Sequence, residues 1–317
     1  MSRKNHIMVS VIMPVYNHEN CIAEAIEGVL MQKTSFGFEL IIGEDCSMDK
    51  SRYIIRRYQK QYPDKIQVIY QSKNQGMRKN IKMIFEKANG KYWAVCEGDD
   101  YWTDCNKLQK QVDFLESHPN FSAVYHNVLC VDGKGRSCKR KSINKYPEKP
   151  EQSYSFEDVK KVKLVGQSAS SLFRNLYRVI DRSLYEKCVC NGDQKICAVM
   201  ACAGDIYYMK EVMACHRVVL DKGCSWSAKT YQKNINLYLY DSYNELCRMI
   251  YRAFHKNFYD DVYIDDLRKN SFIQLCRQTT TKNIFIWFTI TLKYFVSLTR
   301  YLIYWKQSGI ETWRKND

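Results

Sequence analysis

The sequence is poor in proline and glycine, and it lacks the short motifs of common metal-binding and nucleotide-binding loops. Its 317 residues include 5 prolines and 13 glycines, which excludes collagen-like and low-complexity chains because those are rich in both residues. No C-x-x-C pair occurs, and the 14 cysteines follow no regular spacing. Neither a zinc site nor a disulfide framework is therefore indicated, and we expect reduced thiols in the cytosol.

Two phosphate-binding motifs and a leader segment are also missing. No G-x-G-x-x-G follows the first apolar run, and no G-x-x-x-x-G-K-[ST] occurs in the chain. These absences argue against a dinucleotide-binding protein and a P-loop protein. The first residues, Met1–Met8, contain no long apolar core and no small residues typical of a cleavage site. We therefore predict no signal peptide.

The charge is strongly positive, with a formal net charge of +15 and a pI of about 9.1. Such a chain attracts polyanions, which include nucleic acids, anionic lipids and phosphorylated substrates. The sequence has no obvious reading helix or RNA-binding motif, so we expect no nucleic-acid partner. With 45% hydrophobic residues, the chain has the composition of a globular protein with one large domain or two modest ones.

Three acids follow a short apolar run. Glu97, Asp99 and Asp100 surround Gly98 directly after Tyr92–Cys96, and that run has the character of a strand buried on both faces. Ligands of open parallel sheets bind just beyond the carboxyl ends of the strands. Hard cations such as Mg²⁺ or Mn²⁺ take oxygen ligands there and bridge to phosphate. The stretch predicts a metal–diphosphate site, with a solvated acidic turn as the alternative.

Strands and helices alternate over the first 130 residues. We expect strands at 7–14, 38–43, 66–70, 92–96 and 121–131, and helices at 19–31, 51–62, 77–88 and 107–117. This rhythm with short connections predicts an α/β fold with a doubly wound, mostly parallel sheet flanked by helices. Asp45 also follows a strand, so it would lie at the same sheet edge as Asp99 and Asp100. That convergence strengthens the prediction of a metal–diphosphate site.

Four motifs occur in order along this part of the chain. They are Val9-Ser-Val-Ile-Met-Pro-Val-Tyr-Asn17, Glu44-Asp-Cys-Ser-Met-Asp49, Asn74-Gln-Gly76 and Glu97-Gly-Asp-Asp100. In these motifs the sequence resembles the family 2 glycosyltransferases, which have the GT-A nucleotide-sugar fold. The resemblance continues more loosely to residue 227 and does not cover the remainder of the chain.

The resemblance implies a role for each matched acid. Asp100 would be the direct ligand of Mg²⁺ or Mn²⁺ and would bridge to the diphosphate, while Asp99 would contact the ribose and lie near the metal. Asp45 would accept a hydrogen bond from a ring N–H of the base. Asp193, in the turn 191–193, would be the catalytic base, although the residue pattern alone also allows a helix cap there.

The resemblance also places aromatic and small residues around the donor. Pro14, Tyr16 and Asn17 would border the nucleotide base, and Trp102 would line the sugar pocket. Glu97 departs from the family pattern, since an aspartate is usual there, and we expect bonds to neighbouring residues to hold it.

The acceptor half departs from the pattern as well. His216 and Arg217 stand where a Tyr-Arg pair is common. We interpret His126, His216 and His255 as structural or surface residues, with His216 the best catalytic candidate among them. We read residues 132–163 as a basic loop that either draws in a phosphate-bearing acceptor or is merely solvated, and we expect a helix after Ser155 and a strand at 168–173.

The end of the chain has a different character. Residues 228–317 have helical patterns, and 283–306 form a wide apolar face with Lys293 and Arg300 on one side. We favour a helix that lies on an anionic membrane surface, with a packed helix and a membrane span as alternatives. The expected division is a GT-A catalytic domain at 1–227, with a nucleotide-sugar half at 1–130 and an acceptor half at 131–227, and a helical C-terminal region at 228–317.

Together these features lead to a functional hypothesis. We expect a metal-assisted, inverting glycosyltransferase that moves a sugar from a nucleotide sugar, UDP-linked by our reading, to a hydroxyl of a growing surface glycan. The acceptor would be a glycan or a lipid-linked glycan, and the protein would be cytoplasmic and peripheral on the inner face of the cell membrane. The alternative is a module that binds a nucleotide sugar without turnover.

Overall fold

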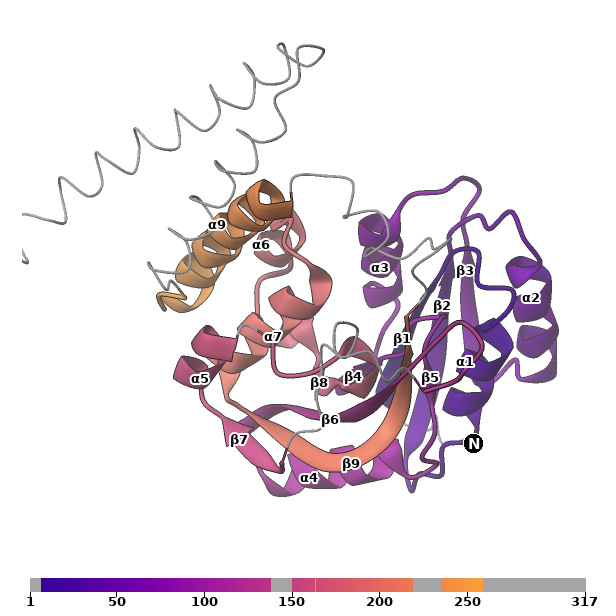
Figure 1. Ribbon diagram of the computed structural model, residues 1–317, viewed down its shortest axis with the longest axis horizontal. Helices are drawn as coiled ribbons and strands as arrows, with labels where there is room; N and C mark the ends of the chain where they lie inside the picture. The colour runs from indigo at the N-terminus through magenta and orange to yellow at the C-terminus, as the bar shows by residue number, and fades with distance from the viewer. Residues whose placement is uncertain (1–6, 138–149, 163, 219–234, 259–317) are drawn as a thin grey trace, which may run out of the picture.

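The computed structural model describes residues 7–137, 150–162, 164–218 and 235–258, and a central sheet with helices on both faces dominates it (Figure 1). The strands are β1 (Ile7–Val15), β2 (Gly37–Glu44), β3 (Ile66–Tyr70), β4 (Tyr92–Val95), β5 (Tyr101–Trp102), β6 (Phe121–Val131), β7 (Gln152–Tyr154), β8 (Leu172–Arg174) and β9 (Asp205–Arg217). The helices are α1 (Ile22–Leu30), α2 (Ser51–Gln61), α3 (Met77–Phe85), α4 (Lys107–Ser117), α5 (Phe156–Val162), α6 (Arg182–Lys187), α7 (Gly192–Ala203) and α9 (Ile235–Phe254), with 3₁₀ turns η1 (Ser168–Ser170) and η2 (Leu176–Arg178).

The strand order within the described ranges is β3-β2-β1-β4-β8-β6-β9-β5. The short strand β7 lies outside this order and pairs antiparallel with β9. The pairs β3–β2, β2–β1, β1–β4 and β6–β9 are parallel, while β8 runs antiparallel to both β4 and β6. The predicted α/β fold with a largely parallel sheet is therefore confirmed. The strand expected at 168–173 differs, because its first half is the turn η1 and only its second half pairs, as part of β8.

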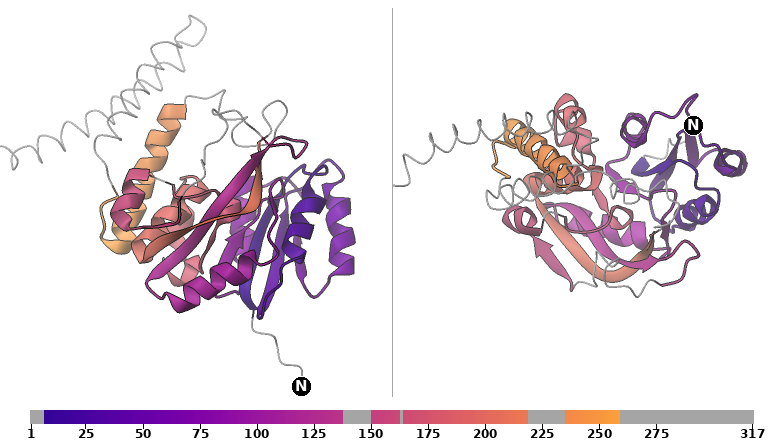
Figure 2. Two further views of the ribbon diagram at one scale, coloured as in Figure 1. Left: turned by 60° about the horizontal axis from the view of Figure 1, so that its bottom comes forward. Right: turned by 45° about the horizontal axis from the view of Figure 1, so that its top comes forward.

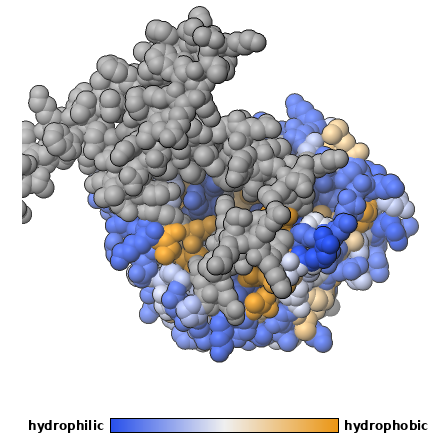
Figure 3. Space-filling model, in the orientation of Figure 1, coloured by the Kyte–Doolittle hydropathy of each residue, from blue (hydrophilic) through white to orange (hydrophobic). Residues whose placement is uncertain are grey.

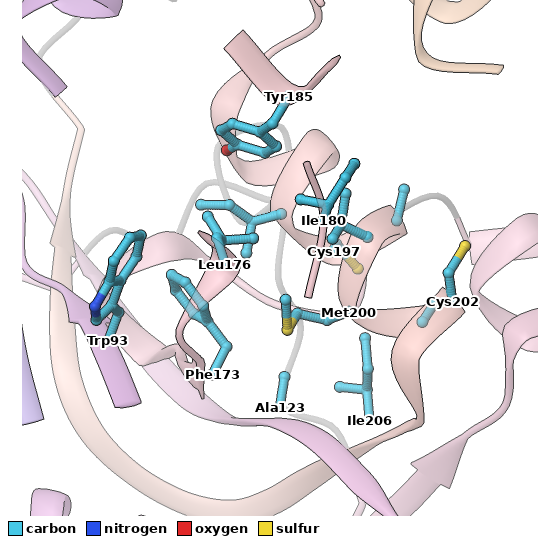
Figure 4. Packing of buried hydrophobic residues seen from close by; sticks show 14 of the residues in the cluster. Trp93, Ala123, Phe173, Leu176, Ile180, Tyr185, Cys197, Met200, Cys202 and Ile206 are labelled. Carbon is cyan, nitrogen blue, oxygen red and sulfur yellow. The ribbon is translucent and has the colours of Figure 1, made fainter. Parts of the chain in front are cut away.

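Each face of the sheet has its own hydrophobic core. Side chains alternate along β1, so Val9, Val11 and Met13 enter the core under α1, α2 and α4, whereas Ile12 enters the opposite core. That second core is shared with α3, α5, α7 and α9, and Figure 4 shows its centre, where Phe173 and Met200 lie together. Figure 2 shows the same two helical layers from other directions.

Two helix starts show how local bonds set the boundaries. The first helix begins at Ile22, three residues later than expected, because the neighbouring loop binds the backbone N–H groups of His18 and Glu19. The helix predicted after Ser155 is present as α5. The Ser155 and Asp158 side chains hydrogen-bond to each other and to each other's backbone N–H, the reciprocal arrangement of a capping box.

The helix α9 packs onto the rest of the fold through buried side chains in the core that α7 also lines. The expected C-terminal region therefore begins with a helix that shares a core with the preceding residues. Across the parts of the chain that the structure describes, no helix combines the length and apolarity needed to cross a membrane. The tail helix predicted at 283–306 and residues 138–149 of the basic loop lie outside the described residues, while the last part of the predicted loop contains β7 and α5.

The described surface is mostly hydrophilic, with small and separate hydrophobic patches in the view of Figure 3. The large hydrophobic side chains that are exposed come from several elements and loops. They are Met31, Met48, Tyr53, Met77, Leu129, Val162, Val212 and Tyr251.

One lysine is completely buried beneath the sheet edge. The Lys107 ammonium lies 4.1 Å from the centre of the Trp102 ring and donates a 2.8 Å hydrogen bond to Gln111. Burial lowers the pKa of Lys107 to about 7. Because the pKa is lower in the folded state, the folded chain binds fewer protons than the unfolded chain between pH 7 and pH 10.5, and its stability should rise with pH across that window.

The change Lys107→Met is expected to raise the free energy of unfolding at pH 7 by about 1–3 kcal/mol. The variant no longer bears the free-energy cost of burying an amine, and this gain outweighs the loss of one hydrogen-bond partner for Gln111. The rise of stability between pH 7 and pH 10 should also become shallower than in the wild type. Urea unfolding at several pH values measures both effects. The exposed neighbour Lys110 provides a matched Met variant with little expected change, and a destabilised Lys107→Met with an unaltered pH profile would contradict this account.

Candidate active site

The carboxyl end of β1 holds the two acidic loops side by side. The Pro14 carbonyl accepts a 3.1 Å hydrogen bond from the Gly98 N–H, and the Val15 carbonyl accepts a 3.0 Å bond from the Asp45 N–H. The acids after β2 and β4 therefore meet at one sheet edge, as the β-α rhythm predicts. Gly98 is required there by space, because an added Cβ would lie 2.7 Å from His18 Nδ1 and 2.9 Å from Val15 Cγ2.

Asp100 is held below the surface of this edge. Its side chain is 1% exposed and accepts 2.8 Å hydrogen bonds from the Arg217 N–H and from Gln167 Nε2. The His216 Nδ1 atom lies 3.1 Å and 3.2 Å from its two oxygens. Three groups thus surround the carboxylate, which suits a residue that fixes the position of the acidic turn.

Asp99 and Glu97 are more open and more crowded. Both side chains are partly exposed, and Ser168 donates a 3.1 Å hydrogen bond to Glu97. Burial and the neighbouring carboxylates raise the pKa of Asp99, and they raise the pKa of Glu97 to about 8. No other residue in the described ranges donates a hydrogen bond to the Asp99 carboxylate. Of the two aspartates, Asp99 is the more exposed residue.

The charge of Asp193, on α7, acts on one of these acids. Its carboxylate contributes to the raised pKa of Glu97, so the two groups interact electrostatically although they are 96 positions apart in the chain. It lies in the first turn of α7 and accepts a 2.8 Å bond from the Gln194 N–H. The helix starts at Gly192, so Asp193 is inside the helix, and Asn191 occupies the N-cap position.

Asp45 organises the loop that follows β3 at this edge. Its carboxylate is 2% exposed and accepts bonds of 2.7 Å and 2.9 Å from the N–H groups of Gln75 and Gly76. Gly76 has a φ of 81°, which glycine adopts at little cost. Asp45 therefore fixes the turn before α3, and this gives it a structural task that the sequence pattern does not reveal.

The residues expected to border the base lie at the end of β1 and in the loop after it. Pro14 is buried in the strand, while Tyr16 and Asn17 are partly exposed. Asn17 has a φ of 57°, and its side chain accepts a 2.9 Å bond from the Met48 N–H. This bond, with that from the Asn17 N–H to Ser47, ties the loops after β1 and β2 together.

The strand β9 carries two further residues of the site. The Arg217 guanidinium donates a 2.9 Å bond to the Asp99 carbonyl and forms a 2.6 Å ion pair with Glu24. Burial favours a neutral His216, but the carboxylates of Asp100, Glu97 and Asp99 outweigh it and raise the pKa to about 9. The sequence pattern assigned neither residue a firm role. The signal it offered was His216, which stands where a tyrosine is common in the family.

Trp102 corrects one expectation. It is 2% exposed, and its indole N–H donates a 2.9 Å bond to the Ala169 carbonyl inside the core. Gly28 packs against its backbone so closely that an added Cβ would lie 2.9 Å away. Trp102 therefore supports the site from below and does not line a sugar pocket.

The donor set at this edge fits a divalent cation that shares its ligands with a substrate. Among the described residues, no three His, Cys, Asp or Glu side chains form a metal cage by themselves. Mg²⁺ and Mn²⁺ commonly bind through one or two carboxylates and complete their shell with phosphate oxygens and water. The carboxylate of Asp99, crowded by Glu97 and Asp100, matches that chemistry because a cation relieves the repulsion among the acids.

The pattern of the family described as "Glycosyl transferase family 2" matches residues 10–180. The chain belongs to this family. The matched range includes both acidic loops and Gln167. The sequence resemblance is therefore confirmed, and the family region extends beyond the first four motifs.

Relatives with glycosyltransferase names match up to half of the chain. "Putative teichuronic acid biosynthesis glycosyltransferase TuaG" of Bacillus subtilis is 32% identical over 160 residues, which are 50% of this chain and 59% of that protein. "Putative glycosyltransferase EpsE" of the same organism is 36% identical over 127 residues, covering 40% of this chain and 45% of that protein. The matched region spans 36% of the length of an uncharacterised Mycobacterium tuberculosis relative that is 42% identical over 123 residues.

A solved structure shares the fold. The S. aureus protein TarS 1-349, in complex with UDP-GlcNAc, has a TM-score of 0.62 and 17% sequence identity, covering 91% of this chain and 80% of that one. This likeness confirms the GT-A type of fold.

Proposed function

We propose that this chain transfers a sugar from a nucleotide sugar to an acceptor hydroxyl, with a divalent cation at the sheet edge. The observation that carries the proposal is the interaction of three elements. Asp45 with its turn and the acidic turn after β4 lie at the carboxyl ends of the strands, and the charge of Asp193 on α7 acts on Glu97 of that acidic turn. Family membership supports the same reaction class.

The donor half would bind the nucleotide diphosphate. Asp99 is our direct ligand for Mn²⁺ or Mg²⁺, in place of the Asp100 that the sequence suggested, because Asp100 is buried among its own donors. When bound, the cation neutralises charge on the leaving diphosphate as a Lewis acid. Asp45 and the loop of Pro14, Tyr16 and Asn17 would shape the base site.

The acceptor half would supply the base. The Asp193 carboxylate would take the proton from the acceptor hydroxyl as that oxygen attacks the anomeric carbon. The other acids are assigned to the donor side, so a single carboxylate remains for proton transfer. A single displacement with inversion follows from that division of roles.

The acceptor class rests on the relatives. The name of TuaG refers to teichuronic acid biosynthesis, which supports a growing surface glycan as the acceptor, and we extend this to a lipid-linked glycan. We further propose UDP as the nucleotide, a cytoplasmic location at the inner face of the membrane, and the division into a catalytic domain at 1–227 and a helical region at 228–317. The tail at 283–306 would supply the peripheral contact with anionic lipid.

Turnover of donor tests the proposal. The purified chain is incubated with Mn²⁺ and with UDP-, GDP- or dTDP-sugars, and release of the nucleoside diphosphate is followed. We expect slow hydrolysis of one donor, since water can replace the acceptor, and faster release when lipid-linked glycan is added. Binding of a donor without any release of diphosphate under either condition would instead support the non-catalytic alternative.

A further inference from the structure

The turn after Gly166 contacts the acidic residues. Gln167 is 5% exposed, and its Nε2 atom lies 2.8 Å from Asp100 Oδ2 and 2.9 Å from His216 Nδ1. The next residue, Ser168, donates to Glu97 at 3.1 Å. Two successive side chains of one turn therefore contact two of the three acids.

The turn is itself rigidly supported. The Gln167 carbonyl accepts the Ser170 N–H at 3.0 Å, and the Gln167 side-chain oxygen accepts the Ala169 N–H. From below, Trp102 Nε1 donates to the Ala169 carbonyl at 2.9 Å, and Gln111 Nε2 donates to the Ser170 carbonyl at 2.9 Å. Side chains from β5 and α4 thus fix the turn in the core.

The arrangement around Gln167 is asymmetric. Its side-chain oxygen is used within the turn, so the amide nitrogen alone faces Asp100. A nitrogen that donates to Asp100 can direct the carboxylate without contributing negative charge to a cluster that already repels itself. A glutamate at this position would add negative charge, and a hydrophobic residue of the same size would donate no hydrogen bond to Asp100.

We propose that Gln167 is a positioning residue that sets the orientation of the acidic turn, and so the affinity of the site for the cation–diphosphate pair. This inference rests on the proposed function. Gln167 would not touch the donor, since it is almost fully buried. It acts through Asp100, which follows Asp99 directly, so a shift of Asp100 displaces the Asp99 carboxylate.

The test compares Gln167→Met with Gln111→Met. Both changes remove a buried amide of the same size that holds the same turn, but Gln111 contacts no acid of the site. Mn²⁺ binding in the presence of UDP is measured from the paramagnetic resonance signal of free Mn²⁺, and thermal unfolding is measured alongside. We expect Gln167→Met to weaken Mn²⁺ binding about 10–100-fold, as outer-shell changes do, and Gln111→Met to stay within about threefold of the wild type.

Two results would overturn the proposal. The first is an Mn²⁺ affinity of Gln167→Met within about threefold of the wild type. The second is that Gln111→Met loses as much Mn²⁺ affinity as Gln167→Met when the melting temperatures of the two variants drop equally. If Gln167→Met does not fold, the Mn²⁺ affinity of Gln167→Asn replaces it in the test. Asparagine keeps the amide but is one methylene too short to reach Asp100. A wild type that binds no Mn²⁺ in the presence of UDP would refute the proposed function itself.

Discussion

Replacing Asp193 with asparagine is expected to lower the turnover of the nucleotide sugar by about 10²–10⁴-fold, the usual contribution of a general base. Asparagine keeps the size of the side chain and still accepts the Gln194 N–H, so α7 should start as before. Only the capacity to take a proton is lost. The rate of diphosphate release at saturating donor measures the effect, while the affinity for UDP should stay unchanged.

A matched control separates this effect from a change at the start of a helix. Asp181 is an exposed acid that caps α6 through the Leu184 N–H, and asparagine is an equally good cap. Asp181→Asn should therefore leave both stability and turnover unaltered. Turnover that is the same in Asp193→Asn and in the wild type would remove Asp193 from the mechanism and return it to the role of a first-turn helix residue.

The change Asp99→Asn is expected to weaken Mn²⁺-dependent binding of UDP by at least roughly 100-fold, more than the loss of an outer-shell partner. The reason is that Asp99 is the more exposed aspartate of the acidic turn, whereas Asp100 is buried among its own donors. The same change should not lower the melting temperature, because it removes one of several carboxylates that repel one another. Calorimetric titration and thermal unfolding give the two quantities.

Asp100→Asn provides the contrast. Asparagine keeps one acceptor oxygen, but its new NH₂ group would face the donor that bonds the other oxygen, either the Gln167 nitrogen or the Arg217 N–H, in a buried position. We expect a loss of about 1–3 kcal/mol in the free energy of unfolding. If Asp100→Asn instead abolished Mn²⁺ binding at full stability while Asp99→Asn bound normally, Asp100 would be the direct ligand, as the sequence first suggested.

The elements that the sequence predicts well are those whose partners are local or whose burial is complete. The bounds of β3, α4 and β6 agree with the expected ranges, because each is a run with one clear period between turn residues. The long strand β9 was not predicted as a continuous element. Its pairing with β6 joins residues far apart in the chain, and such pairing leaves only a weak local pattern.

The site also has features that the sequence predicts and features that it does not. The strand-end acids reveal themselves by position, so the meeting of Asp45 with the acidic turn is predictable. The orientation of two adjacent aspartates is not, since it depends on Gln167, His216 and Arg217 from the distant acceptor half. A glutamine between a glycine and a serine gives no local sign that it is buried against an acid.

The central claim is that this sheet edge binds a nucleoside diphosphate through a divalent cation. Titration of UDP into the wild-type chain, once with Mn²⁺ and once with a chelator, tests it most directly. The account predicts binding with Mn²⁺ and a loss of most of that affinity with the chelator. Equal affinity for UDP in both conditions, or no binding of UDP, GDP or dTDP in either, would contradict it.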